Sequence, residues 1–489
     1  MKEPTMSGWL RVACVWLAVA AIPAAVLAAA PATPAATPPA ATTPAAPAAK
    51  SATPTAPAAP TASADDLRAI LRLFFAEEDA AKRAELAGRV GAAAPKSWAD
   101  LKAMLHAAAP RPALPAGRQT FTTVAGGGMP SVKYLLRVPT GYAADAGRGW
   151  PLIITCHGTG GNAEGALGAL ESWMGPDIEN YLAVAAESPR EGVYEPGQTN
   201  TLYPREVLDD VRRRANVDSD RVLLTGVSKG GYATWAAALF TPGEWAGAAP
   251  IACYPATEAG AAGAILYLPN VLAVPVQAHW GGMDIEPGQN EGINTLSRDA
   301  AAEMKRLAAT KFEGIEYSGE GHGLKVKADR LRAFFAAARR DPFPAECRLL
   351  FHHLYQGRNF YARATALARE EFNFRVPREV KVAGGVTDPR AVKRALLTAE
   401  GFELTARLPA GKNLVGLMAR NLKEIEVDLP AERLDFSRAV RVTVNSRTVA
   451  EAVRKIDWVE LLETVRRTGD FDRLVAGRVK VTVPGVKTP

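Results

Sequence analysis

Two kinds of hydrophobic pattern follow each other through the middle of the chain. Continuous apolar runs that end in glycine occur at 150–161 (WPLIITCHGTGG) and 220–226 (DRVLLTG), and they predict strands buried on both faces. Stretches with helical spacing of apolar residues lie between such runs, as at 201–217 (TLYPREVLDDVRRRANV). Strands that alternate with helices indicate a mostly parallel sheet covered by helices. We expect this α/β domain to span residues 120–341.

The pattern differs on either side of this block. Residues 63–119 have the apolar spacing of helices, and Gly91 and Pro95 are expected to end one of them. Residues 345–489 contain alternating runs typical of strands, such as AVRVTVNSRTV at 439–449, and one predicted helix near 449–469. The sequence therefore predicts a short N-terminal helical segment, the α/β domain, and a β-rich C-terminal domain.

The N-terminus has the pattern of an export signal. Lys2 and Arg11 precede an apolar run that is too short to span a bilayer, and small residues follow it. We interpret residues 1–30 as a signal peptide, cleaved after Ala28 or Ala30, with an uncleaved membrane anchor as the alternative. Residues 31–62 are rich in Ala, Pro and Thr and predict an extended linker. These features predict a secreted or periplasmic protein.

Charge is distributed unevenly along the chain. Of the net +7, residues 345–489 carry +8, from 26 Lys and Arg against 18 Asp and Glu. This excess suggests contact with an acidic polysaccharide or an anionic envelope surface. The basic residues are dispersed and form no recognisable motif, so a solvated basic surface is the simpler interpretation and no nucleic acid is expected.

Cysteine usage gives little evidence of a disulfide framework. Removal of the signal would leave Cys156, Cys253 and Cys347. We expect Cys156, inside a predicted core strand, to be a buried thiol, while a bridge between Cys253 and Cys347 stays open. No zinc-ligand spacing is present, and no metal or organic cofactor is implied.

A candidate nucleophile lies between a predicted buried strand and a predicted helix. Residues 226–230 (GVSKG) fit the pattern G-x-S-x-G around Ser228. A tight turn of this kind holds the serine in a strained conformation with its hydroxyl exposed, and the flanking glycines permit close approach of the backbone. The alternative is a glycine-rich turn without chemistry.

A serine hydroxyl needs a base, and the base needs an orienting acid. His322, in GEGHGL, follows the last predicted strand of the α/β domain and is the expected base. The acid should lie between serine and histidine in chain order. Asp284, in HWGGMDIEPG, meets this requirement, and Glu286 competes with it. A surface histidine and a solvated turn carboxylate are the alternatives without chemistry.

Acyl transfer also requires donors for the oxyanion that develops in the transition state. The backbone N–H groups of Thr159, after a predicted strand, and of Lys229, after the serine, are the expected oxyanion hole. The neighbouring His157 is expected to pack and to hydrogen-bond rather than to act as a base.

The segments HGTGG, TGVSKGGYATW, GGMD and GEGHG occur in this order. They resemble those of secreted bacterial α/β-hydrolases of the polyhydroxybutyrate-depolymerase-like and feruloyl-esterase-like kind. Prolyl-oligopeptidase-type predicted peptidases are similar over the same stretch. The resemblance implies the α/β-hydrolase fold and a Ser-Asp-His triad. Two features depart from it: Lys229 replaces a common methionine or glutamine, and the turn before Asp284 is one residue longer than H-G-x-x-D.

These residues together favour a secreted serine esterase that acts through an acyl-enzyme. Ser228 would attack the ester, His322 would carry the proton, and Asp284 would orient His322. A serine peptidase of the prolyl-oligopeptidase type is one alternative, although no propeller-like repeat is found. A non-catalytic binding protein on a hydrolase scaffold is the other. A fold alone does not select the substrate among feruloyl, acetyl, polyester and small esters.

Overall fold

The computed structural model describes residues 64–485, except 94, 126–129, 145, 189–201, 286–291, 373 and 375–388. The proposed signal peptide and linker and the alternative acid Glu286 lie outside these residues. Residues Pro60–Pro489 form one compact unit, so the finer domain boundaries stay predictions. Within the described part of the chain, no helix is long and apolar enough to cross a membrane.

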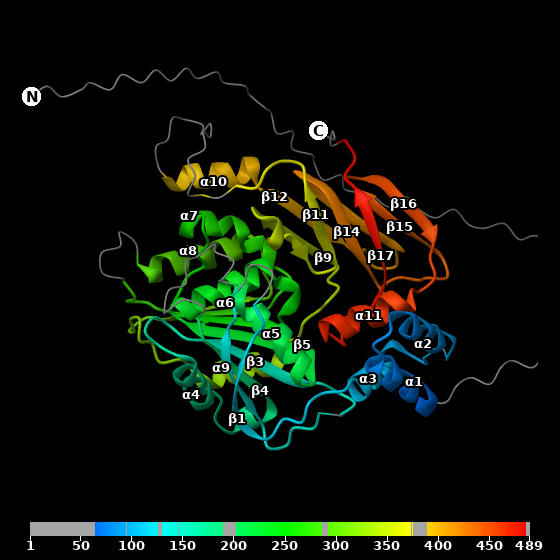
Figure 1. Cartoon of the computed structure of the whole chain (residues 1–489). Helices are drawn as coiled ribbons and strands as arrows, with labels where there is room; N and C mark the ends of the chain where they lie inside the picture. Colours follow the sequence, from blue (N-terminus) through cyan, green and yellow to red (C-terminus); the bar gives the residue numbers. More distant parts are fainter. Residues whose placement is uncertain are drawn as a thin grey trace, which may run out of the picture. The chain divides into compact units, whose positions relative to one another are not determined.

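An eight-stranded sheet forms the centre of this unit, in the order β1-β2-β4-β3-β5-β6-β7-β8 (Figure 1). Strand β2 is antiparallel to both of its neighbours, and the strands from β4 to β8 are all parallel. The strands are β1 (Gly117–Thr122), β2 (Lys133–Val138), β3 (Trp150–Cys156), β4 (Leu182–Ala186), β5 (Val217–Val227), β6 (Gly247–Ile251), β7 (Val276–Gly281) and β8 (Phe312–Tyr317).

Helices cover both faces of this sheet, as the continuous apolar strands require. Ile153 of β3 packs in one core cluster with residues of α4 (Ala163–Met174) and α9 (Ala328–Ala337). Leu152 and Ile154 point to the opposite face, which is covered by α5 (Tyr203–Arg214), α6 (Lys229–Phe240) and α8 (Ile293–Arg306). The strand order and the two helical layers confirm the predicted α/β-hydrolase fold.

The C-terminal part contains two further sheets, which confirms its predicted β-rich character. Their orders are β10-β11-β14-β17 and β16-β15-β13-β12-β9. The strands are β9 (Glu346–Phe351), β10 (Arg358–Asn359), β11 (Ala362–Leu367), β12 (Phe402–Arg407), β13 (Leu414–Arg420), β14 (Leu422–Pro430), β15 (Ala439–Val444), β16 (Arg447–Val453) and β17 (Val475–Thr482). Two α-helices accompany them, α10 (Pro389–Glu400) and α11 (Trp458–Thr468), and a short α7 (Gly260–Ala264) lies near α10.

The helix predicted near 449–469 is shorter than expected, because its first five residues, 449–453, belong to a strand. Asn445 and Ser446 have φ values of 49° and 66° and connect β15 to β16 in a two-residue hairpin. Such a turn fits the twist of an antiparallel pair. It therefore extends the strand pattern to Val453, and α11 begins only at Trp458.

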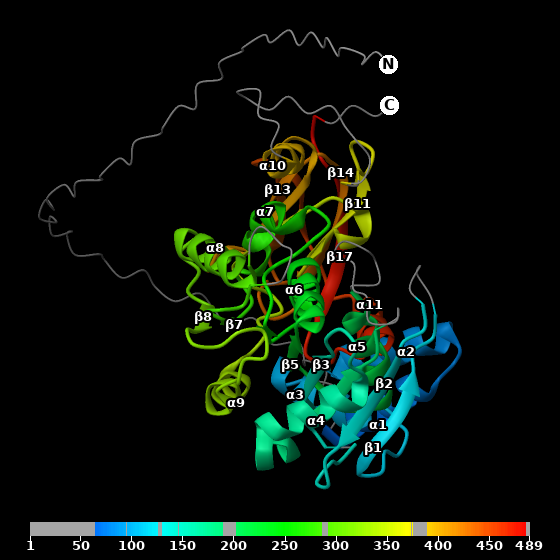
Figure 2. The same cartoon turned by 90° about the vertical axis from the view of Figure 1, so that its left-hand side faces the viewer.

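The N-terminal helices α1 (Ala64–Ala76), α2 (Ala80–Ala93) and α3 (Trp98–Ala108) pack against α11, at the far end of the sequence (Figures 1 and 2). Helix α2 ends at Ala93, between Gly91 and Pro95, as the sequence predicted. A Cβ at Gly91 would lie 2.4 Å from the indole of Trp458. This glycine therefore also permits the close approach of two helices near the end of α2.

Candidate functional site

Ser228 occupies the turn between β5 and α6, and the backbone around it is tightly constrained. Its φ of 55° and ψ of −119° are unusual for a residue with a side chain. A Cβ at Gly226 would lie 2.4 Å from the Gly230 oxygen, and one at Gly230 would lie 2.1 Å from the Cys156 oxygen. The Ser228 N–H donates to the Ile251 carbonyl at 2.8 Å, which ties the turn to β6. Glycine is therefore required on both sides of the serine.

The structure joins the three predicted residues Ser228, His322 and Asp284 in one hydrogen-bonded chain. The Nε2 atom of His322 lies 2.8 Å from Ser228 Oγ, and its Nδ1 atom lies 2.9 Å and 3.2 Å from the two carboxylate oxygens of Asp284. The His322 side chain is 45% exposed, whereas that of Asp284 is 2% exposed. A buried acid thus orients an imidazole whose other nitrogen faces an accessible hydroxyl.

Backbone hydrogen bonds hold the acid-bearing turn against the loop that carries the histidine. The Asp284 N–H donates to the Gly281 carbonyl at 3.2 Å, and the Asp284 carbonyl accepts from Asn294 at 3.1 Å. The Met283 N–H donates to the Glu320 carbonyl at 2.9 Å, two residues before His322. Because β7 and β8 are parallel neighbours, their carboxyl ends bring both loops to the same edge of the sheet as β5.

The two residues expected to form the oxyanion hole lie beside the serine turn. A Cβ at Gly158 would lie 3.1 Å from the Val227 oxygen and 3.4 Å from Ser228 Cβ, so the loop that continues to Thr159 packs on this turn. Lys229 is the first residue of α6. The first N–H groups of a helix have no acceptor within the helix, and this end favours negative charge.

His157 does not belong to the serine chain. Its side chain is buried, with Nδ1 2.9 Å from the Gly158 carbonyl oxygen. Its Nε2 accepts from the Ser188 N–H at 3.1 Å and lies 3.3 Å from a Glu187 carboxylate oxygen. These contacts fix the loop after β3 and agree with a packing role.

The three cysteines of the described chain are free and buried, so Cys253 and Cys347 form no bridge. Burial raises the pKa of Cys156 to about 12. Burial also raises the pKa of Cys253, and the nearby Asp284 charge adds to the effect. The Cys253 sulfur would be 2.3 Å from a Cβ at Gly231, so this thiol packs against the first turn of α6. These thiols are poor nucleophiles.

One group among the described residues has side chains suited to a metal ion: Glu258, His352 and His353. A Glu258 oxygen lies 3.1 Å from His352 Nε2 and 3.6 Å from His353 Nε2. Although burial raises the pKa of Glu258, hydrogen bonds from the two imidazoles outweigh burial and lower it to about 2. Tyr267 and Glu371 contact the remaining imidazole nitrogens. These hydrogen bonds satisfy the group without an ion.

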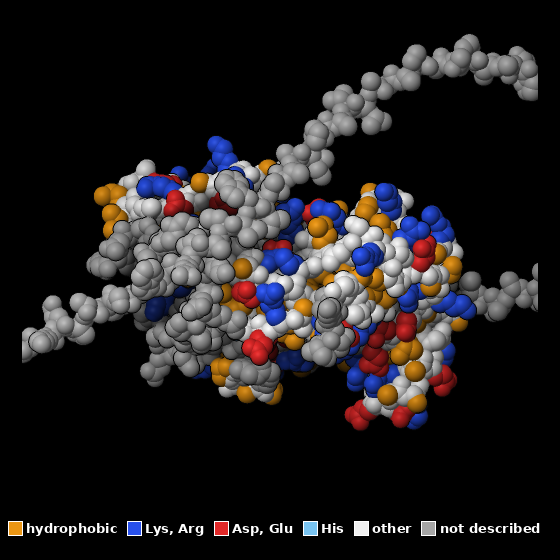
Figure 3. All heavy atoms as spheres, turned by 90° about the horizontal axis from the view of Figure 1, so that it is seen from above, with side chains coloured by type: hydrophobic (Ala, Val, Ile, Leu, Met, Phe, Trp, Pro, Cys, Tyr) orange, Lys and Arg blue, Asp and Glu red, His pale blue; other side chains and the backbone are white. Residues whose placement is uncertain are grey.

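Many basic side chains of the C-terminal sheets face carboxylates on neighbouring strands. Arg363 pairs with Glu426 at 2.8 Å, and Lys480 pairs with Glu424 at 2.8 Å. Figure 3 shows Lys and Arg interspersed with Asp and Glu over the described part of one face. Contact with an acidic polymer stays a prediction.

The chain is similar to known hydrolases over part of its length. It is 29% identical over 171 residues to the poly(3-hydroxyalkanoate) depolymerase C of Paucimonas lemoignei. The matched stretch covers 32% of this chain and 39% of the relative. The chain thus spans about two fifths of the length of this curated relative. This similarity confirms the resemblance to depolymerase-like hydrolases.

Two solved structures also match, each at 14% sequence identity. An acetyl xylan esterase from Aspergillus awamori matches with a TM-score of 0.36, over 45% of this chain and 99% of that one. An acylaminoacyl peptidase from Pyrococcus horikoshii matches with a TM-score of 0.35, over 47% of this chain and 43% of that one. No protein-family model matches the chain.

Proposed function

We propose that the protein is a serine hydrolase that cleaves carboxylic esters through an acyl-enzyme. The observation that supports this most is the hydrogen-bonded chain from Ser228 through His322 to buried Asp284, which starts on a strained strand-to-helix turn. Sequence similarity to a polyester depolymerase supports an ester as the substrate class.

In the proposed reaction, His322 Nε2 takes the Ser228 proton as Oγ attacks the ester carbonyl carbon. The Thr159 and Lys229 N–H groups stabilise the oxyanion, and one such donor contributes about 3–4 kcal/mol in the transition state. The protonated imidazole then gives its proton to the leaving alkoxide, and the acyl group stays on Ser228. Water, deprotonated by His322, attacks this acyl-enzyme, releases the acid and restores the serine. Asp284 stabilises the imidazolium in both halves.

The proposal is tested by hydrolysis of p-nitrophenyl esters of graded chain length, a feruloylated sugar and a dipeptide amide. We expect turnover of at least one ester and little or none of the amide. Faster turnover of the amide would establish a peptidase instead. No turnover of any substrate, with no labelling of Ser228 by a fluorophosphonate, would favour a non-catalytic binding protein. We further propose that the protein is exported, because of its N-terminal sequence pattern.

A further inference from the structure

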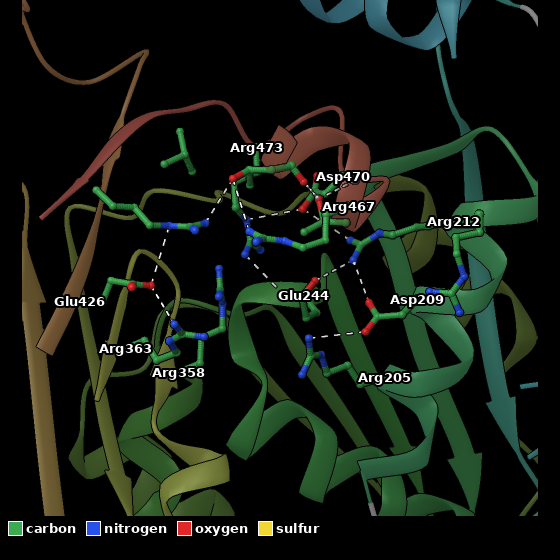
Figure 4. A pocket seen from close by; sticks show the side chains of 15 residues that line it. Arg205, Asp209, Arg212, Glu244, Arg358, Arg363, Glu426, Arg467, Asp470 and Arg473 are labelled. Atoms are coloured by element: carbon green, nitrogen blue, oxygen red, sulfur yellow. Dashed lines mark hydrogen bonds and ion pairs between the residues drawn. The ribbon is translucent and has the colours of Figure 1, made fainter. Parts of the chain in front are cut away.

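A cavity of about 390 Å³ lies away from Ser228, between α5 and the C-terminal sheet β10-β11-β14-β17 (Figure 4). The 310-helix η3 (Pro242–Glu244) contributes Glu244, four residues beyond the C-terminal end of α6. Ser228 lies at the opposite, N-terminal end of α6, and this 12-residue helix is about 18 Å long. The cavity is therefore separate from the candidate catalytic site.

Arginine dominates the lining of this cavity. Eight arginines face four carboxylates: Arg205, Arg212, Arg213, Arg358, Arg363, Arg467, Arg473 and Arg478 against Asp209, Glu244, Glu426 and Asp470. Three carboxylates outside the lining, Asp210, Asp428 and Glu460, also pair with lining arginines. The arginines still outnumber all of these acids. Figure 4 shows guanidinium groups that approach the cavity from both the hydrolase and the C-terminal elements.

Two of the guanidinium groups are buried with donors that have no hydrogen-bond acceptor. Arg212 is 3% exposed; its Nη1 binds Glu244 at 2.8 Å, but its Nη2 has no hydrogen-bond partner. Arg473 is 5% exposed; its Nη2 donates to the Gly243 carbonyl, but its Nε has no partner. The nearest carboxylate to both unpaired atoms is Asp470, at 3.5–3.6 Å. Buried donors are nearly always satisfied in folded proteins, so a missing acceptor points to a ligand.

The cavity mouth carries a further uncompensated cation. Arg467 is exposed, and within the described chain it makes no ion pair; one of its nitrogens lies 3.5 Å from Thr464 Oγ1. At the inner end, burial lowers the pKa of Arg473. The Glu244 and Asp470 charges oppose this shift, while the Arg340 and Arg358 charges add to it. Arg467 therefore lacks a carboxylate partner among the described residues, and the charges around Arg473 do not fully offset the cost of its burial.

We propose that this cavity binds a phosphate- or sulfate-type oxyanion, alone or as an ester. Planar guanidinium groups bind such oxyanions through paired hydrogen bonds, which would supply acceptors to Arg212 and Arg473. A cavity of about 390 Å³ has the size of a small-molecule pocket, which leaves room for an organic group beside the anion. The anion would link α5 to the C-terminal sheet and α11. This proposal does not depend on the esterase function.

The test is thermal unfolding of the full chain with inorganic phosphate, sulfate and glucose 6-phosphate, each matched in ionic strength by sodium chloride. Anything that binds only the folded state raises the unfolding midpoint in a saturable way. We expect such a rise with phosphate and none with chloride. Tighter binding of glucose 6-phosphate would identify an ester as the preferred form, and equal binding would identify the inorganic anion; both support the site.

Adjacent arginines of one helix provide a matched pair of variants. Arg467→Gln removes a lining cation and should weaken the apparent phosphate affinity about tenfold or more. Arg466→Gln changes an exposed neighbour that does not line the cavity and should leave the affinity unchanged. Both positions are exposed, so both variants should fold. The proposal is overturned if none of the three anions gives a saturable rise, or if both variants weaken binding equally.

Discussion

Replacement of Asp284 by asparagine tests the proposed orienting role with almost no change in shape. The carboxylate accepts from His322 Nδ1, which leaves Nε2 free to accept the serine proton. The amide of asparagine can instead donate to Nδ1, and the ring proton then moves to Nε2, where it blocks acceptance from Ser228. A tautomer error of this kind costs on the order of 10⁴ in kcat, or about 5.5 kcal/mol.

The assay is the steady-state hydrolysis of the best p-nitrophenyl ester by wild type, Asp284→Asn and Glu286→Gln. We expect kcat of Asp284→Asn to fall by about four orders of magnitude with little change in KM, because the lost interaction acts mainly on the transition state. Glu286→Gln should be nearly silent. A kcat for Asp284→Asn within tenfold of wild type, at an unchanged far-UV spectrum, would refute the reasoning, and a large loss in Glu286→Gln would transfer the role to that residue.

Three further predictions concern stability. Burial and the nearby Arg330 charge lower the pKa of His279 to about 4, so the unfolded chain binds more protons than the folded chain between about pH 6.5 and 4. The free energy of unfolding should therefore fall by about 3 kcal/mol as the pH drops through this range. Urea unfolding at each pH measures this change, which should be smaller in His279→Asn. Gly230→Ala places a Cβ 2.1 Å from a β3 carbonyl and should lower stability by about 1–3 kcal/mol or more and abolish activity, whereas Gly168→Ala, in open space on α4, should not lower the unfolding midpoint. Arg340→Met removes the hydrogen bonds at 2.8 and 2.9 Å from the Arg340 guanidinium to the buried Asp470 carboxylate. The free energy of unfolding, measured in the same assay, should fall by about 3–5 kcal/mol.

Contradictory outcomes are specific to each of these variants. Equal acid sensitivity of wild type and His279→Asn would mean that another group accounts for the pH dependence. Full activity in Gly230→Ala would show that the serine turn tolerates a side chain. A change below about 1 kcal/mol in Arg340→Met would mean that water compensates the Asp470 charge.

The α/β-hydrolase fold and the candidate serine chain were accessible from sequence because local patterns carry them. A buried strand ends just before Ser228, at Val227, and the helix after it starts at Lys229, as the local pattern predicted. Chain order then restricted the choice of acid and base. Sequence alone could not place Asp284 against His322, because the contact depends on the parallel pairing of β7 with β8.

The features that sequence reasoning missed depend on contacts between distant segments. The arginine cavity joins Arg205 to Arg473, and no local pattern marks these residues as neighbours. The close packing of Gly91 on Trp458 was missed as well, because these two residues lie far apart in the sequence. Asn445, a residue that tolerates positive φ, was a weak hairpin signal just before the predicted helix, whereas Ser446 in the second turn position gave no such signal.

Reaction with a fluorophosphonate probe, followed by intact-mass and peptide analysis, tests the central claim most directly. Such a probe phosphonylates a serine only when a neighbouring base activates it. Wild type should gain one adduct per chain, located on Ser228, while His322→Ala should react far more slowly and Ser228→Ala should not react. Labelling of Ser228→Ala at the wild-type rate, or an adduct on another residue, would contradict the account.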